Sequence, residues 1–133
     1  MATAPDRVKT GFEGASPILS VRSMAASVRY YVDVLGFRNA DWGTEDFTSV
    51  NRDRAEIYLC QGGQGGPGTW VWVGVEDVAA LYEEYRAAGA KIRQEPVNHP
   101  WAYEMQVEDP DGHVLRLGSE PRADMPFADR FKD

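Results

Sequence analysis

The chain carries an internal repeat, and this repeat limits its possible folds more than any other feature of the sequence. Residues 21–31, VRSMAASVRYY, and residues 75–85, VEDVAALYEEY, match at a constant offset of 54 residues. The shared apolar positions recur at helical spacing, so each copy predicts one helix with a single buried side. Residues typical of helix ends flank both copies, at the N-cap and after the last turn: Ser23, Asp77, Gly36 and Gly89.

A strand precedes each predicted helix, and three strand-like segments follow it. In TWVWVGV, strict alternation places Trp70 and Trp72 on one face and the valines on the other. The other strand-like segments are PILSVR, FRNADW, DFTSVN, AEIYLC, KIRQEPV, YEMQVE and HVLRLG. A β-α-β-β-β unit therefore occurs twice, which predicts an α+β fold with roughly eight strands.

Length and composition predict one ordinary globular domain over residues 1–133, with 43% hydrophobic and 26% charged residues. We place repeat one at about residues 15–61, a linker at 62–68, repeat two at about 69–120 and a C-terminal tail at 121–133. The net charge of −7 disfavours nucleic acid as a partner. No apolar run is long enough for a membrane span, and the start, MATAPDRVKT, lacks the core of a secretory signal. A single cysteine, Cys60, excludes an internal disulfide and favours a cytoplasmic location.

Three segments carry a family resemblance: SVRSMAASVRYYVDVLGF, TWVWVGVEDV and PWAYEMQVEDPDGHVL. Over about residues 15–120 the chain resembles the vicinal oxygen chelate superfamily of glyoxalases, bleomycin-resistance proteins and dioxygenases, and it looks most like the bleomycin-resistance binding proteins. The resemblance implies a curved eight-stranded sheet built from the two repeats, with cup-shaped clefts completed in a homodimer. Pro17 matches a proline associated with strand exchange in bleomycin-resistance proteins, so dimers with and without exchange of the first strand both stay open.

In the enzymes of that superfamily, histidine and glutamate side chains from four strands hold a divalent metal. The resemblance maps these four positions onto Ser16, Tyr58, Trp70 and Arg116. Hydroxyl groups are weak ligands, an indole offers no usable lone pair, and a guanidinium repels a cation. His113 has no partner at metal-ligand spacing and is expected to begin a strand, while His99 lies in the loop before Trp101. We therefore expect no metal, no cofactor and no catalytic residue.

The same positions suit a binding cleft. The candidate ligand-binding residues are Trp42, Phe47, Glu56, Tyr58, Trp70, Trp72, Trp101, Glu104 and Arg116, with Trp42 and Phe47 expected on the second and third strands. Aromatic walls with a few polar groups hold flat molecules by stacking and burial. Carboxylates would attract a cationic group, and the candidates are Glu45, Asp46, Glu56 and Glu104. The competing interpretation is that aromatic residues at strand spacing fill the core.

The sequence favours a non-catalytic, cytoplasmic homodimer that sequesters a planar, antibiotic-like small molecule, with or without a cationic group. An alternative is a metal-dependent or metal-free lyase, isomerase or dioxygenase that acts on a small metabolite, with Glu104 as a candidate general base. A third hypothesis is a regulatory dimer whose cup is filled by its own tail through Phe127 and Phe131. Enzymatic activity stays open at this point, and resemblance does not identify the ligand.

Overall fold

The computed structural model describes residues 9–10 and 12–128. Its first half contains β1 (Ile18–Ser20), α1 (Met24–Arg29), the π-helix η1 (Tyr30–Val34), β2 (Arg38–Asn39), β3 (Phe47–Arg52) and β4 (Ala55–Cys60). Its second half contains β5 (Trp70–Gly74), α2 (Val78–Ala88), β6 (Lys91–Asn98), β7 (Tyr103–Glu108) and β8 (Val114–Ser119). The predicted order of elements is therefore confirmed, together with the α+β class.

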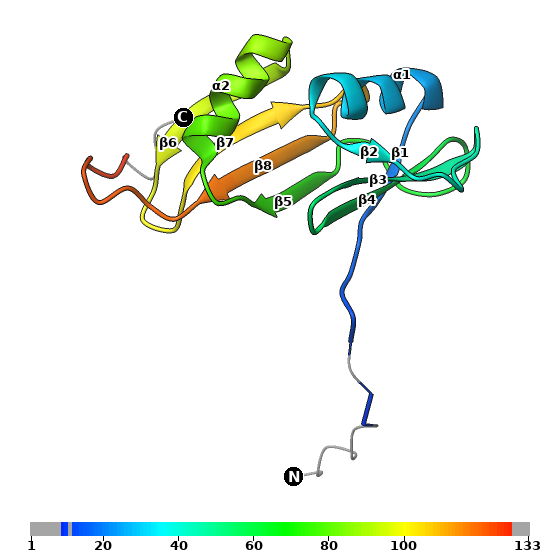
Figure 1. The fold of residues 1–133 in the computed structure, drawn as a ribbon, viewed down its shortest axis with the longest axis horizontal. Coiled ribbons are helices and arrows are strands. Elements are labelled where there is room, and N and C mark those ends of the chain that lie inside the picture. The colour runs from blue at the N-terminus through cyan, green and yellow to red at the C-terminus, as the bar shows by residue number, and fades with distance from the viewer. Residues whose placement is uncertain (1–8, 11, 129–133) are drawn as a thin grey trace.

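The strands form two four-stranded sheets, which we call the first sheet (β1-β4-β3-β2) and the second sheet (β5-β8-β7-β6). In each sheet, the strand before the helix pairs in parallel with the last strand of its half. The remaining pairs in both sheets are antiparallel. Both helices lie on the same side of the molecule, above the sheets (Figure 1).

The helices begin where the sequence predicts. The Ser23 side chain accepts a hydrogen bond from the backbone N–H of Ala26, and Asp77 does the same for Ala80. The first helix changes from α1 to η1 at Tyr30, yet the two segments together span the same repeat positions as α2, offset by 54. Gly89 ends α2 in the left-handed region at φ 81°, a conformation that glycine adopts without strain. None of the helices described here is long and apolar enough to cross a membrane.

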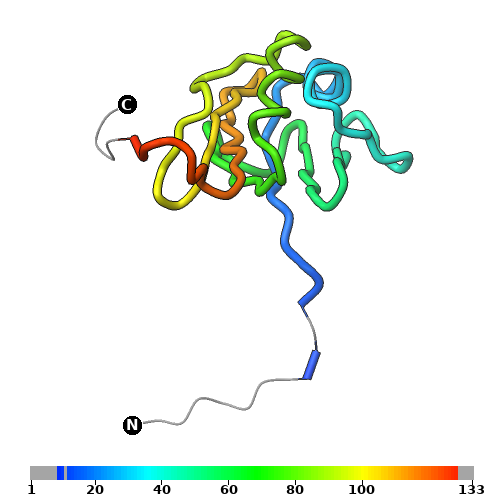
Figure 2. The backbone as a smooth tube through the Cα atoms, turned by 60° about the vertical axis from the view of Figure 1, so that its left-hand side comes forward, coloured from blue at the N-terminus to red at the C-terminus, as the bar shows by residue number. Residues whose placement is uncertain are grey.

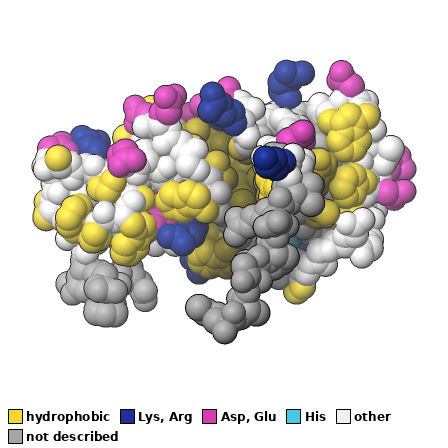
Figure 3. Space-filling view, turned by 90° about the horizontal axis from the view of Figure 1, so that it is seen from below, with side chains coloured by type: hydrophobic (Ala, Val, Ile, Leu, Met, Phe, Trp, Pro, Cys, Tyr) yellow, Lys and Arg dark blue, Asp and Glu magenta, His cyan; other side chains and the backbone are white. Residues whose placement is uncertain are grey.

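The core lies between the helices and the sheets. Along each strand, alternate side chains point toward the helices, and the buried strand residues include Leu19, Val50, Ile57, Leu59, Met105, Val107, Leu115 and Leu117. Tyr31 and Tyr85 occupy matching positions in the two helices, and both are fully buried. We call the opposite side of each sheet its helix-free face. Seen from that side, hydrophobic side chains lie exposed on both halves of the molecule (Figure 3).

The second strand is shorter than the sequence predicts. Only Arg38 and Asn39 of FRNADW pair with β3, so the expectation that Trp42 lies on this strand is wrong. The backbone N–H of Gly43 donates to the carbonyl of Ala40 over 3.1 Å, which closes a turn that contains Trp42. Aspartate and glycine on either side of Trp42 favour such a turn over an extended strand.

Within one chain the two sheets are not joined into a continuous one, because no described strand pairs β1 with β5. The linker between the halves passes against the outer edge of β1. A Cβ atom on Gly65 would lie 2.9 Å from the carbonyl oxygen of Ile18 and 2.9 Å from the backbone nitrogen of Ser20. The described segment before β1 runs away from both sheets (Figure 2).

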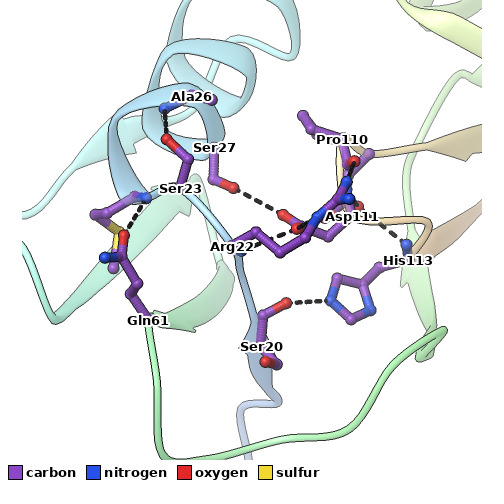
Figure 4. A network of polar contacts seen from close by, with 11 residues as sticks. Ser20, Arg22, Ser23, Ala26, Ser27, Gln61, Pro110, Asp111 and His113 are labelled. Carbon is purple, nitrogen blue, oxygen red and sulfur yellow. Dashed lines mark hydrogen bonds and ion pairs between the residues drawn. The ribbon is translucent and has the colours of Figure 1, made fainter.

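The turn between β7 and β8 joins the two halves (Figure 4). Its Asp111 side chain accepts hydrogen bonds from the Arg22 backbone N–H (2.9 Å), from Arg22 Nε (3.0 Å) and from Ser27 Oγ (3.1 Å). Asp109 accepts from the hydroxyl of Tyr31 over 2.9 Å. These bonds attach a turn of the second half to the start of the first helix.

His113 completes this junction from a fully buried position. Its Nδ1 accepts from the backbone N–H of Thr69 over 2.9 Å, so its Nε2 carries the proton and donates to the carbonyl of Ser20 over 2.6 Å. His113 directly precedes β8, near the expected strand start, and the structure adds its contact with the first half. One imidazole thus connects β1, the segment before β5 and the segment before β8.

Replacing His113 with phenylalanine keeps a ring of similar size but removes both hydrogen bonds. Because Ser20 and Thr69 then lose partners in a partly buried junction, we expect a loss of about 1–3 kcal/mol in the free energy of unfolding. Urea denaturation measures it. His99→Phe is the matched control and should cost less, because His99 Nδ1 has no hydrogen-bond partner among the described residues. Equal midpoints for wild type and His113→Phe would contradict this role.

Candidate ligand-binding site

The helix-free face of the second sheet carries most of the candidate residues. Trp70 and Trp72 project from β5, and the register places Trp72 opposite Arg116 on β8. Each of the two indoles is 50% exposed. We call the set Trp70, Trp72, Arg93, Trp101, Glu104, Gln106 and Arg116 the tryptophan face.

Trp72 owes its position to a glycine on the neighbouring strand. A Cβ atom on Gly118 would lie 2.4 Å from Cη2 of Trp72, so any other residue at this position would push the indole away. The guanidinium carbon of Arg116 lies 5.3 Å from the centre of the Trp72 ring, within cation–π range. Trp72 is therefore held flat along β8 and leaves its outer surface to solvent.

Glu104 is the buried anchor of the tryptophan face, with 2% of its surface exposed. It accepts hydrogen bonds from Arg116 Nε (2.9 Å), Arg116 Nη2 (2.8 Å) and Trp101 Nε1 (2.6 Å). Burial alone would raise the pKa of Glu104, but the bonds from Arg116 and Trp101 outweigh it and the pKa is lowered. The ionised carboxylate thus orients two candidate side chains, and its oxygens are already engaged within the protein.

Trp101 projects from the loop between β6 and β7 and is 54% exposed. Its ring stacks on His99, with the centroids 4.4 Å apart and the planes 5° from parallel. The hydrogen bond to Glu104 fixes the opposite edge of the indole. Stacking on one side and a hydrogen bond on the other hold this half-exposed ring in place.

The remaining candidates form a second group on the first sheet. Phe47 and Tyr58 stack with centroids 5.4 Å apart, and Trp42 stacks on Phe47 at 6.3 Å. Beside them, the carboxylate of Glu56 accepts hydrogen bonds from Ser16 Oγ and Ser49 Oγ. The candidates thus divide between two sheets of the chain instead of meeting on one surface. A hollow of about 400 Å³ adjoins this group, lined by Glu13, Gly14, Ala15, Ser16, Arg54, Glu56 and Tyr58.

A larger groove of about 1230 Å³ separates the two halves. Trp72, Trp101 and Gly118 line one wall. The β3–β4 turn at Asp53 and the side of α2 at Leu81 line the others. The two indoles therefore reach from the tryptophan face into the space between the halves.

Comparison with known proteins places the chain in a family. The model of the Glyoxalase/Bleomycin resistance protein/Dioxygenase superfamily matches residues 15–117. The chain belongs to this superfamily. No curated protein sequence matches the chain significantly.

Several solved structures resemble the chain. A bleomycin-binding protein from Streptomyces verticillus, in complex with copper(II)-bleomycin, is 28% identical with a TM-score of 0.71, over 85% of this chain and 99% of the other. TioX from Micromonospora sp. ML1 is 24% identical with a TM-score of 0.68, over 80% and 99%. A further bleomycin-binding protein in complex with bleomycin is 20% identical with a TM-score of 0.69, over 82% and 99%. The latter two support the fold alone.

The donor set does not suit the divalent metal that enzymes of the superfamily use. At two of the four equivalent positions, Ser16 donates to Glu56 and Arg116 is paired with Glu104. The other two hold the phenol of Tyr58 and the indole of Trp70. Among the described residues, no three histidine, cysteine, aspartate or glutamate side chains gather where they could hold a metal ion. We therefore derive no metal-dependent step for this chain.

Sequence reasoning missed Arg93, Gln106 and the role of Gly118. Arg93 reaches the site through a β-bulge, which strand alternation does not reveal. The sequence does indicate on which face Gly118 lies, because it follows Arg116 by two residues and therefore shares its face of β8.

Replacing Glu104 with glutamine should destabilise the fold by about 1–3 kcal/mol near neutral pH, because the buried bonds to Arg116 lose their charge. A lowered pKa stabilises the folded state above the ordinary value of 4.5, and this contribution is lost as pH falls through the folded value. The difference between wild type and Glu104→Gln in urea denaturation should therefore shrink in acid. Glu108→Gln, which breaks a more exposed pair with Lys91, is the control and should cost less than about 1 kcal/mol. A difference independent of pH would refute this account of Glu104.

Proposed function

We propose that this protein binds a flat aromatic small molecule by stacking on its tryptophans and does not transform it chemically. The observation that carries the proposal is the exposure of all four indoles, which lies between 50% for Trp70 and 57% for Trp42. Core-filling tryptophans would be buried, and exposed aromatic surface of this kind is typical of interaction sites. Trp72 and Trp101 are in addition held in fixed orientations by Gly118 and Glu104.

The superfamily comparisons support a ligand-binding role. The similar protein from Streptomyces verticillus is a bleomycin-binding protein with the same fold. We propose by analogy that this chain sequesters an antibiotic-like molecule in the cytoplasm; the analogy does not name the molecule. Catalysis by Glu104 is the weaker alternative, because Glu104 is 2% exposed and its bonds to Arg116 and Trp101 lower its pKa, which makes it a weaker base.

The described part of the C-terminal tail does not occupy the tryptophan face. Asn98, at the end of β6, accepts a hydrogen bond from the backbone N–H of Arg122 through its Oδ1. Its Nδ2 donates to the backbone carbonyls of Arg122 and Met125. Phe127 is 56% exposed, and Phe131 lies outside the described residues. These contacts favour a cleft that is open to a ligand over a cleft filled by Phe127.

We propose that the clefts are completed in a homodimer, with the N-terminal strand exchanged or retained. β5 is an edge strand of the second sheet, and Phe12, in the segment that runs away from the body, is 98% exposed. An unpaired edge and a projecting apolar arm favour pairing with a second chain. Static light scattering at micromolar concentration should give twice the 14.8 kDa mass of the chain. A mass of one chain across that range would refute the dimer.

The stacking role of the tryptophans is tested by Trp70→Ala and Trp72→Ala. A thermal-shift screen of peptide, polyketide and aromatic antibiotics first supplies a ligand, and calorimetric titration then compares the variants. Each should weaken binding by about 1–3 kcal/mol, as expected for an aromatic anchor. Stability should fall less, because a half-exposed ring leaves no closed cavity. Leu117→Ala, at a site only 1% exposed, is the core control and should cost about 2–5 kcal/mol of stability. If Trp70→Ala and Trp72→Ala instead lose much stability and keep their affinity for the ligand, the tryptophans stabilise the fold and the stacking role is refuted.

A further inference from the structure

We infer that the tryptophan face selects a ligand whose flat ring carries a planar anionic group of the carboxylate class, bound by Arg93 and Arg116. This inference rests on the proposed function and adds the sign of the ligand's charge at this face. The sequence suggests a cationic group on the ligand, attracted by carboxylates that include Glu104. In the structure Glu104 is already paired with Arg116, which favours the opposite charge on the ligand.

Arg93 reaches the tryptophan face through an irregularity in β6. Ile92 pairs with Val107 and Gln94 pairs with Gln106, so Arg93 is the extra residue of a β-bulge. Bulges redirect side chains and occur often beside functional sites. The guanidinium donates a hydrogen bond to Oε1 of Gln106, and its position over the sheet is thereby fixed.

From there Arg93 crosses the whole width of the second sheet. Its guanidinium carbon lies 4.9 Å from the ring centre of Trp70, although β5 and β6 are the two edge strands of this sheet. The sheet is therefore curved enough for side chains from both edges to meet above its centre, where Val114 is only 3% exposed. No carboxylate forms an ion pair with Arg93 in the described part of the chain.

Arg116 supplies the second set of donors. An arginine has five N–H groups, and Arg116 uses Nε and Nη2 to bind Glu104. Nη1 and the second N–H of Nη2 make no hydrogen bond to any described residue, and 37% of the side chain is exposed. Gln106, the partner of Arg93, lies directly opposite Arg116 in the β7–β8 register. The two guanidinium groups thus flank one glutamine on the same face.

The carboxylates near the tryptophan face do not neutralise the positive charge of Arg93. Glu104 is bound to Arg116, and Glu108 is bound to Lys91 Nζ over 2.6 Å. With Arg93 and Arg116 against Glu104, the tryptophan face keeps an excess positive charge in a chain whose net charge is −7, and the neighbouring Lys91–Glu108 pair adds none. Guanidinium groups match planar oxyanions in geometry, and a ring bearing one would stack on an indole while its oxygens reach an arginine.

The test compares 2-naphthoate with 2-naphthamide, two probes that share a ring and differ in charge. In calorimetric titrations, the wild-type protein should bind the carboxylate roughly tenfold more tightly or better, because hydrogen bonds to charged groups carry the difference. Arg93→Gln should remove most of that preference, so that the variant binds the two probes with similar affinity. Arg29→Gln, which removes an exposed arginine of α1 and the same charge, should behave as wild type.

Each other result has a distinct meaning. Equal affinity for both probes in the wild type would overturn the inference while the proposed stacking function stands. Binding of neither probe would overturn the proposed function and this inference with it. Light scattering on Arg93→Gln covers the remaining case: a loss of assembly with unchanged preference for the carboxylate would show that Arg93 pairs with a second copy, and would overturn the inference.

Discussion

The buried imidazole of His113 is the contact on which the arrangement of the two halves depends. Its Nε2 donates to the carbonyl of Ser20 in β1, and its Nδ1 accepts from the backbone N–H of Thr69, just before β5. The backbone N–H of His113 donates to the side chain of Asp109. β8 begins at the next residue, so the junction also fixes where this strand starts. The tryptophan-face residues of β8 and β5 therefore take their positions from a contact outside that face. Buried polar groups of this kind are costly unless fully satisfied, which is why the junction specifies one arrangement.

A second buried polar group, Glu104, fixes side chains of the tryptophan face, as His113 fixes the two halves relative to each other. Its carboxylate binds Arg116 and Trp101, one from a strand and one from a loop. A buried ion pair is weak evidence for stability, because desolvation offsets much of the attraction. Its clearer consequence is orientation, since a half-exposed indole and a half-exposed arginine would otherwise sample many rotamers. Preorganised walls lower the entropy that a ligand must overcome on binding.

Local patterns in the sequence predicted the features that depend on neighbouring residues. Alternation in WVWVG and the caps at Ser23 and Asp77 are of this kind, and the structure confirms them. Features that depend on distant residues were not predictable in the same way. The partner of His113 on β1 lies 93 positions away, and the bulge at Arg93 exists only in relation to β7. The turn at Trp42 is intermediate, because aspartate and glycine flank this residue and favour a turn, while the segment FRNADW as a whole is strand-like.

Strand alternation also explains how a superfamily scaffold holds such different sites. On β8, Leu115 and Leu117 point into the core, while Arg116 and Gly118 lie on the helix-free face. A change at Arg116 therefore alters the chemistry of one face and leaves the packing of the other intact. In this chain the position to which the resemblance assigns a metal ligand holds an arginine, and the buried leucines beside it remain in the core. The period of two along a strand thus separates the residues that pack the core from those that set the chemistry of the helix-free face.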